Sequence, residues 1–141
     1  MARIARSVAA LRISGDDLVP ADITKVLGCE PSFAHIKGES IVGKNTGKVR
    51  ITKSGIWNLK ASECIPENLD AQISELLSKL STDLEVWKEI NSKFTIDLFV
   101  GLFMNESNEG LEISPTSLKN LGEREILLGL DIYDPCDDEK W

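Results

Sequence analysis

The sequence has no long apolar run, few cysteines and a single histidine, and each scarcity narrows the classes of protein to consider. No apolar segment approaches the roughly 20 residues that a membrane-spanning helix needs, and arginines interrupt the N-terminal stretch before a secretory signal forms. The three cysteines are odd in number, far apart and outside any C-x-x-C spacing, which argues against a disulfide framework and against a zinc site. We therefore expect a cytoplasmic protein with no metal and no cofactor, whose thiols at Cys29, Cys64 and Cys136 are idle.

Aromatic residues make up only 6% of the chain, and this scarcity bears on whether its one strongly basic region binds nucleic acid. Residues 37–60 carry six lysines and arginines against one glutamate, but Trp57 is the single aromatic residue among them. Proteins that track single-stranded nucleic acid usually combine basic groups with several stacking aromatics. Because the chain as a whole has a net charge of −7, we do not expect a nucleic acid partner or a membrane partner.

Residues 38–45 nearly match the phosphate-binding motif G-x-x-x-x-G-K-[ST]. The last position is Asn45, which has no hydroxyl to offer a magnesium ion, and a turn signal follows where the motif requires a helix. We therefore reject nucleotide hydrolysis and interpret the region as a basic hairpin. Its predicted strands lie around residues 49–51 and Ile56, with the turn near residues 53–55.

The charge is distributed unevenly along the chain. Residues 1–60 contain ten Lys and Arg against five Asp and Glu, a net charge of +5, whereas residues 61–141 contain six against eighteen, a net charge of −12. Such a division predicts either self-complementary packing or distinct surfaces for partners, with ordinary solvated faces as the alternative.

The apolar periodicity predicts an α+β fold class, a single-domain sandwich in which a mostly antiparallel sheet of about five or six strands carries helices on one face. The domain covers residues 1–133, and residues 134–141 form an acidic flexible tail. The strands are expected at residues 8–13, 49–51, around 56, 94–104, 111–113 and 126–133, and the helices at 20–27, from 66, from 82 and at 115–121. A weak sequence repeat between the first and last predicted helices is compatible with two β-α-β-like halves.

Several side chains have a specific expected place. Residues 29–40 read as a structured loop, and Asp97 needs a partner because it interrupts the most apolar strand. Trp57 reads as a core anchor more readily than as an exposed contact. Val26, Leu84 and Leu118 are expected on the inner faces of their helices.

Several motifs in this order resemble the bacterial domain of unknown function 4279 family. They are Leu11-Arg-Ile-Ser-Gly-Asp-Asp-Leu, Pro20 with Leu27-Gly28 and Pro31, Lys37-Gly38-Glu39, Ser54-Gly55-Ile56-Trp57 and Gly129-Leu-Asp-Ile-Tyr133. The resemblance covers roughly residues 9–133 and implies a compact α+β domain. It brings no established reaction, so no catalytic residue is carried over, although Gly15, Asp16, Trp57 and Asp131 match family-like positions.

Three functions from different classes compete. The first is a non-enzymatic protein-binding module, best described as an immunity or antitoxin protein whose acidic C-terminal half meets a basic toxin. The second is a hydrolase in which His35 and carboxylates among Asp16, Asp17, Asp97 and Asp131 converge. The third is a small-molecule or peptide sensor with a pocket at Trp57 and the basic hairpin. The candidate partner-binding residues are Asp16, Asp17, His35, Lys37, Trp57 and Asp131.

Overall fold

The computed structural model describes residues 2–135, which form four helices and two sheets. The expected acidic tail therefore lies, from residue 136 onwards, outside the described residues. The strands are β1 (Arg6–Gly15), β2 (Phe33–His35), β3 (Ser40–Val42), β4 (Val49–Ile51), β5 (Gly55–Lys60), β6 (Thr95–Phe103) and β7 (Leu127–Tyr133). The helices are α1 (Pro20–Leu27), α2 (Leu69–Ser78), α3 (Leu84–Lys93) and α4 (Pro115–Glu123).

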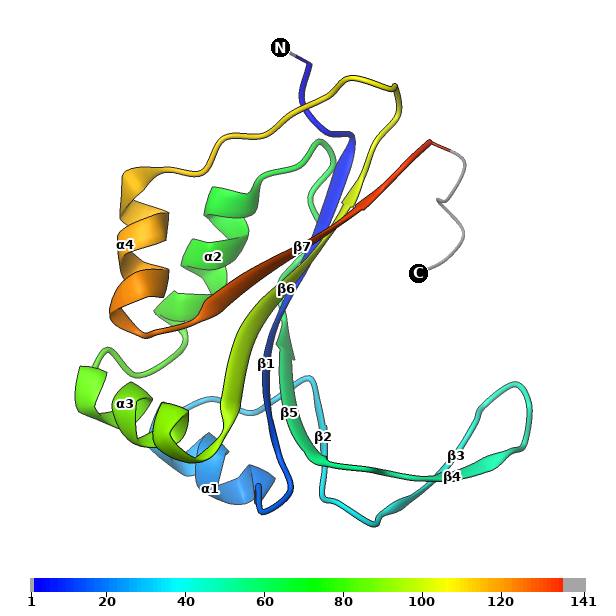
Figure 1. The fold of residues 1–141 in the computed structure, drawn as a ribbon, viewed down its shortest axis with the longest axis vertical. Coiled ribbons are helices and arrows are strands. Elements are labelled where there is room, and N and C mark those ends of the chain that lie inside the picture. The colour runs from blue at the N-terminus through cyan, green and yellow to red at the C-terminus, as the bar shows by residue number, and fades with distance from the viewer. Residues whose placement is uncertain (1, 136–141) are drawn as a thin grey trace.

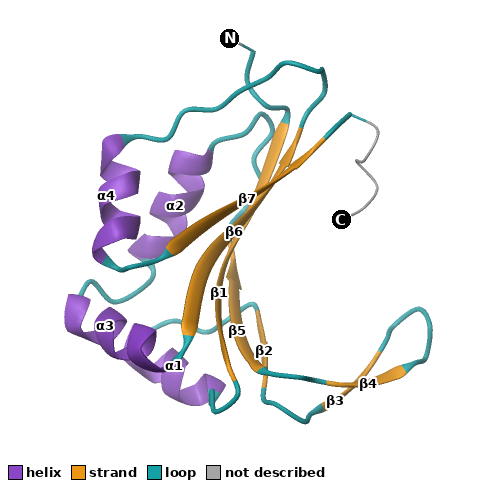
Figure 2. Ribbon diagram, in the orientation of Figure 1, coloured by secondary structure: helices purple, strands orange, loops and turns teal. Residues whose placement is uncertain are grey.

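Five strands form the main sheet in the order β2-β5-β1-β6-β7. Every neighbouring pair is antiparallel except β6 and β7, which are parallel. All four helices cover one face of this sheet, and no helix within residues 2–135 covers the other, which we call the open face (Figures 1 and 2). The structure thus confirms the α+β single-domain fold with helices on one face.

Two β-α-β connections organise the domain. Strands β6 and β7 are adjacent and parallel, with α4 between them in the chain. Strands β1 and β2 flank α1 in the same way, and both run antiparallel to β5, which lies between them in the sheet. The two units therefore resemble each other in connectivity, but the first is split by an inserted strand.

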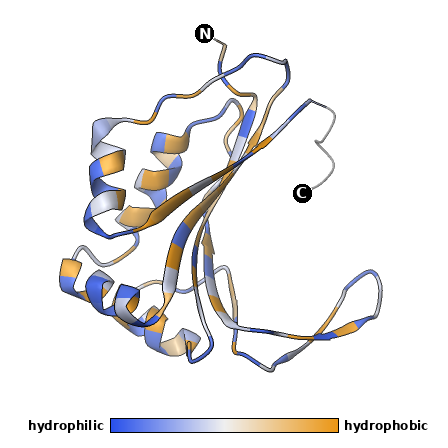
Figure 3. Cartoon of the chain, viewed as in Figure 1, coloured by the Kyte–Doolittle hydropathy of each residue, from blue (hydrophilic) through white to orange (hydrophobic). Residues whose placement is uncertain are grey.

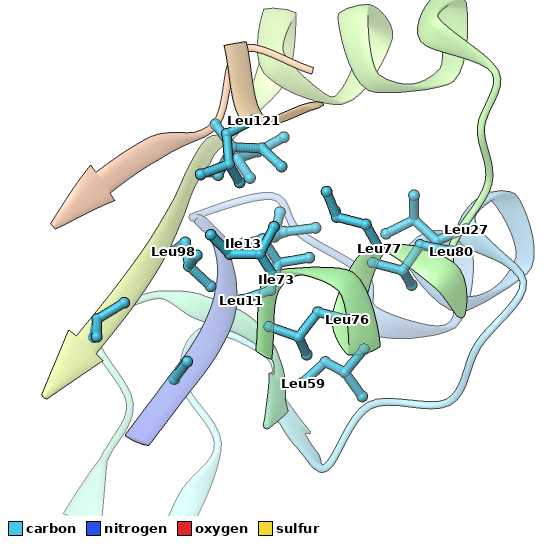
Figure 4. Close-up of a cluster of buried hydrophobic side chains, with 14 of the residues drawn as sticks. Leu11, Ile13, Leu27, Leu59, Ile73, Leu76, Leu77, Leu80, Leu98 and Leu121 are labelled. Atoms are coloured by element: carbon cyan, nitrogen blue, oxygen red, sulfur yellow. The ribbon is translucent and has the colours of Figure 1, made fainter. Parts of the chain in front are cut away.

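Strand β1 lies at the centre of the sheet because one of its faces is apolar in strict alternation. Ala9, Leu11 and Ile13 are 5%, 1% and 0% exposed and point toward the helices, as the period of two predicts. They meet the buried side of β6 and the leucines of α2 (Figure 4). The pattern therefore places the helix layer on one defined side of β1.

The ends of two helices follow local sequence rules. Pro20 occupies the first turn of α1, and Gly28 ends it in the left-handed region at φ 81°. Pro115 opens α4 behind the cap Ser114, whose side chain accepts a hydrogen bond from the amide of Ser117. No helix within residues 2–135 combines the length and apolarity required to cross a membrane.

Polar groups join α2 to β1 inside the core. Gln72 is 1% exposed, and its Nε2 donates to the carbonyl oxygens of Ser7 and Ser62 at 2.9 and 3.0 Å. Its Oε1 accepts from Ser7 Oγ at 2.8 Å, and the same Oγ accepts from the amide of Asn68 at 3.2 Å. Because these groups are buried and partnered, they fix how α2 sits on the sheet.

The basic region forms a hairpin, but with a different turn from the predicted one. Strand β4 pairs with β3, not with β5, and the connection is residues 43–48. Gly47 adopts φ 64° in this turn, and its amide donates to the carbonyl of Gly43 at 3.0 Å. The β3–β4 hairpin projects from the domain as an arm (Figure 1). The expected loop at residues 29–40 also contains a short edge strand, β2, which pairs with β5.

Three further expectations about local structure are wrong. Val26, Leu84 and Leu118 are 44%, 43% and 51% exposed, because the helices rest on the sheet through neighbouring residues such as Ile23, Trp87 and Leu121. Helix α3 begins at Leu84, with Asp83 as its N-cap, rather than at residue 82. Residues 111–113 form no strand, although Leu111 and Ile113 pack partly buried against the core.

Candidate partner-binding groove

The turn after β1 sets one wall of a groove between α1 and α3. At Gly15 an added Cβ would lie 2.5 Å from Cδ1 of Phe94, so the absence of a side chain lets the Phe94 ring rest against the end of β1. The amide of Leu18 donates to the carbonyl of Gly15 at 3.3 Å, and α1 begins two residues later. Gly15 and Pro20 therefore position α1 beside Phe94, the residue that follows α3.

Helix α3 is held in place from its other end. Trp87 is fully buried, and its Nε1 donates to the carbonyl of Ser81 at 2.8 Å. The amide of Ser81 in turn donates to the carbonyl of Leu27, the last residue of α1, at 2.9 Å. These two bonds tie the start of α3 to the end of α1, so the two helices stay side by side (Figure 1).

The groove between these helices has a volume of about 540 Å³. Its walls are mostly apolar, and Val19 and Val26 are 48% and 44% exposed at its surface. Three carboxylates and one ammonium group also line it. The lining residues are Asp17, Val19, Asp22, Ile23, Val26, Val86, Glu89, Ile90, Lys93 and Phe94.

The charges of the groove are only partly compensated. Glu89 and Lys93 are exposed and lie 3.4 Å apart one turn along α3, a pairing that contributes little in water. The side-chain carboxylates of Asp17 and Asp22 have no hydrogen-bond or ion-pair partner among residues 2–135. The groove therefore combines an apolar floor with excess negative charge, which suits an apolar segment that also carries Lys or Arg.

The structure brings three of the predicted partner-binding residues, Asp16, Asp17 and Lys37, to one end of the sheet. Asp16 Oδ2 and Lys37 Nζ form an exposed ion pair at 3.2 Å, between the turn after β1 and the loop after β2. Asp17, the next residue, lines the groove. Asp16 and Lys37 thus lie beside the groove but already neutralise each other.

Trp57 does not reach any surface. Its side chain is 0% exposed, and its Nε1 donates to Thr24 Oγ1 of α1 at 3.0 Å. The core interpretation is therefore the correct one, and Trp57 is unavailable as a partner contact or as the wall of a pocket.

His35 and Asp131 belong to the open face of the sheet, at opposite edges. His35 lies on β2 opposite Ile56 of β5, while Asp131 lies on β7 opposite Gly101 of β6. His35 is three strands from Asp97, which corresponds to about 14 Å at the usual strand spacing. The sheet therefore does not bring this histidine to either carboxylate.

Charged and aromatic side chains cover the open face. Arg12 binds both carboxylate oxygens of Asp97, at 2.9 and 2.6 Å, and lies 4.5 Å above the centre of the Phe99 ring. The hydrogen bonds that Arg12 donates to Asp97 raise the pKa of Arg12, against the effect of burial. Arg6 lies 3.9 Å above the Phe103 ring, which stacks on Tyr133. Asp97 thus has the partner that the sequence required, and these side chains are engaged with one another.

Several groove residues were not identified by sequence reasoning. Glu89, Lys93 and Val86 of α3 are not among the candidate residues named from the sequence. The one indication in the sequence was that these residues lie outside the inner apolar stripe of α3, which is complete without them. Within residues 2–135, no cluster of three or more His, Cys, Asp or Glu side chains forms a metal site.

Comparison with known proteins gives one match. Residues 5–135 match a family model described as a domain of unknown function (DUF4279). No curated protein and no solved structure matches the chain.

Proposed function

The chain belongs to the domain of unknown function family DUF4279, and from that premise we propose that it is a non-enzymatic protein-binding module. It holds an apolar, basic segment of a partner protein in the groove between α1 and α3. The partner we propose is a toxin, which the module neutralises by covering it.

The observation that carries this proposal is the pair of unpartnered carboxylates, Asp17 and Asp22, beside an exposed apolar floor. Burying the exposed parts of Val19 and Val26 under a partner is worth about 25 cal/mol for each Å² removed from water. The carboxylates add selectivity for Lys or Arg on the partner and speed its association. A groove of about 540 Å³ has room for a few side chains of an inserted segment.

The placement of the titratable residues supports binding over hydrolysis. General acid–base catalysis needs the participating groups within about 3 Å of the atoms that exchange the proton. Asp16 is paired with Lys37, Asp97 is held by Arg12, and His35 on β2 lies three strands from Asp97 on β6. The geometry therefore favours recognition of a macromolecule.

The toxin proposal is supported by charge. The protein is acidic overall, because residues 61–141 carry a net charge of −12. Helix α3 contributes Glu89 to the lining of the groove. A basic toxin is attracted to such a surface and bound in a preferred orientation, and an acidic partner is repelled.

The test is a binding measurement between the purified chain and the product of the neighbouring gene, with growth rescue as the cellular readout. The doubly substituted Asp17→Asn/Asp22→Asn variant should slow association by about ten-fold and weaken its dependence on salt. Glu106→Gln removes one exposed carboxylate in the loop after β6, away from the groove, and is the matched control. Equal association rates for the groove variant and the control, or no complex with the neighbour's product, would overturn the proposal.

A further inference from the structure

Among residues 2–135, strand β7 pairs with a strand on one side only, so it forms one edge of the five-stranded sheet. It is seven residues long, whereas β2 at the other edge has three. Leu127, Leu130 and Ile132 are 65%, 39% and 57% exposed, and Figure 3 shows hydrophobic colours along much of this strand. Exposed edge strands are usually protected by Lys, Pro or a bulge, and β7 contains neither Lys nor Pro.

The backbone groups that face outwards along this edge can be identified. The carbonyl of Tyr133 accepts a hydrogen bond from the amide of Met104, directly after β6, so Tyr133 directs its backbone groups toward β6. Backbone groups alternate in direction along a strand. Gly129 and Asp131 therefore also direct theirs toward β6, and Leu128, Leu130 and Ile132 direct theirs outwards.

We propose that β7 pairs with the β7 strand of a second copy of this chain, antiparallel across a two-fold axis at Leu130. In this register Leu130 faces Leu130 of the other copy, and Leu128 faces Ile132 in both directions. All three outward residues then fall in hydrogen-bonded pairs, which gives about six interchain hydrogen bonds and a continuous ten-stranded sheet.

The side chains select this register over its neighbours. With the axis at Leu130, Asp131 of each copy lies opposite Gly129 of the other, so no carboxylate faces another. Moving the axis to Asp131 would place two carboxylates directly opposite each other, which is destabilising. Moving it to Gly129 would leave Ile132 outside the ladder. The side chains of Leu130 and Ile132 extend to the helix side, where α4 also exposes Leu118.

The dimer leaves the groove between α1 and α3 open, because the groove and β7 lie in different parts of the molecule (Figure 1). Each copy therefore keeps its own groove, and the dimer would present two partner-binding sites. The inference is independent of the proposed function, since it needs only the edge strand.

The experiment measures molecular mass by light scattering and sedimentation across a micromolar concentration series, together with amide hydrogen exchange. We expect a dimer, with the amides of Leu128, Leu130 and Ile132 exchanging slowly although none of them donates within the monomer's sheet. Leu130→Pro removes an outward amide that β6 does not use, so it should convert the dimer into a folded monomer. Leu130→Thr retains the amide and suits a strand, and it should remain dimeric.

Three outcomes would overturn the inference. They are a monomeric wild type with fast exchange at these amides, a Leu130→Pro variant that stays dimeric, and protection of the three amides only after a different protein is added. Circular dichroism and a melting curve establish that the Leu130→Pro variant is folded. If that variant fails to fold, Leu130→Lys gives the same reading, because it places two ammonium groups face to face at the axis.

Discussion

Replacing Gln72 by Leu should destabilise the protein strongly, although Leu is a better helix former and more apolar. The substitution removes three buried hydrogen bonds, two donated to the carbonyls of Ser7 and Ser62 and one accepted from Ser7 Oγ. The carbonyl of Ser7 keeps a second donor, the amide of Cys64 at 3.1 Å, and Ser7 Oγ still accepts from the amide of Asn68. The buried hydroxyl of Ser7 loses the acceptor for its proton, and the carbonyl of Ser62 keeps a long contact from Cys64 Sγ at 3.9 Å.

The expected cost follows from these contacts. Each lost hydrogen bond costs about 1 kcal/mol net, and a buried group left without a partner costs about 1–3 kcal/mol. The added apolar burial of Leu offsets about 1 kcal/mol of this. The free energy of unfolding should therefore fall by about 3–5 kcal/mol, which lowers Tm by roughly 10–20 °C for a chain of this size.

The assay is urea denaturation monitored by Trp fluorescence, with Ser74→Ala on the exposed side of α2 as the control, which should change stability by less than about 0.5 kcal/mol. A double-mutant cycle with Ser7→Ala should give a coupling energy of about 1 kcal/mol. If Gln72→Leu left the unfolding free energy within about 0.5 kcal/mol of wild type, the reasoning from buried hydrogen bonds would be refuted.

The remaining predictions concern two glycines and one carboxylate. Gly55→Ala should cost about 2 kcal/mol in denaturant unfolding, because its Cβ would lie 2.9 Å from the backbone oxygens of Gly15 and Leu18. Gly122→Ala, in α4 with nothing within 4 Å, should instead stabilise by about 0.5 kcal/mol, so equal effects would contradict the packing argument. Burial alone would raise the pKa of Asp70, but hydrogen bonds from Ser114 and Ser117 lower it overall. The resulting stabilisation is present above the unfolded-state pKa near 4 and is lost as pH falls through the folded-state value. Denaturant titrations from pH 6 down to about 2 should show that the free energy of unfolding falls less for Asp70→Asn than for wild type. The same fall in both proteins would contradict the prediction.

The elements that the sequence predicted well are those determined by neighbouring residues. The alternation in β1 and the Pro20 and Gly28 boundaries of α1 depend on local sterics, which act in any fold. Strand β6 is recognisable because it is apolar over most of its length. Its one carboxylate, Asp97, predicted a partner because an unpaired charge is costly to bury. That partner, Arg12, is 85 residues away, and only the sheet register identifies it.

The basic hairpin shows why turn position was harder. Residues 43–48 and 53–55 both carry glycine and polar residues, so both are plausible turns. The choice depends on whether Val49 and Ile51 pair with the strand before them or with the one after them. Local propensity does not decide this choice. The sheet decides it, because β5 already has β1 and β2 as its two neighbours.

The candidate site depended most on tertiary structure. Asp17 was selected from its turn, but the groove also needs Glu89 and Phe94 from a helix that is some seventy residues further on. Gln72 illustrates the opposite problem, since amphipathic patterns assign polar atoms to the surface. Its side chain is buried here with its polar atoms bonded.

The central position of β1 has a consequence for synthesis. β1 is the first strand to leave the ribosome, yet its two neighbours in the sheet are β5 and β6, which begin about 40 and 80 residues later. Since long-range strand pairing is slow, its apolar side must wait for both neighbours. A nascent chain arrested before residue 95 would therefore display Leu11 and Ile13 to chaperones, and protection would begin only after Phe103 has emerged.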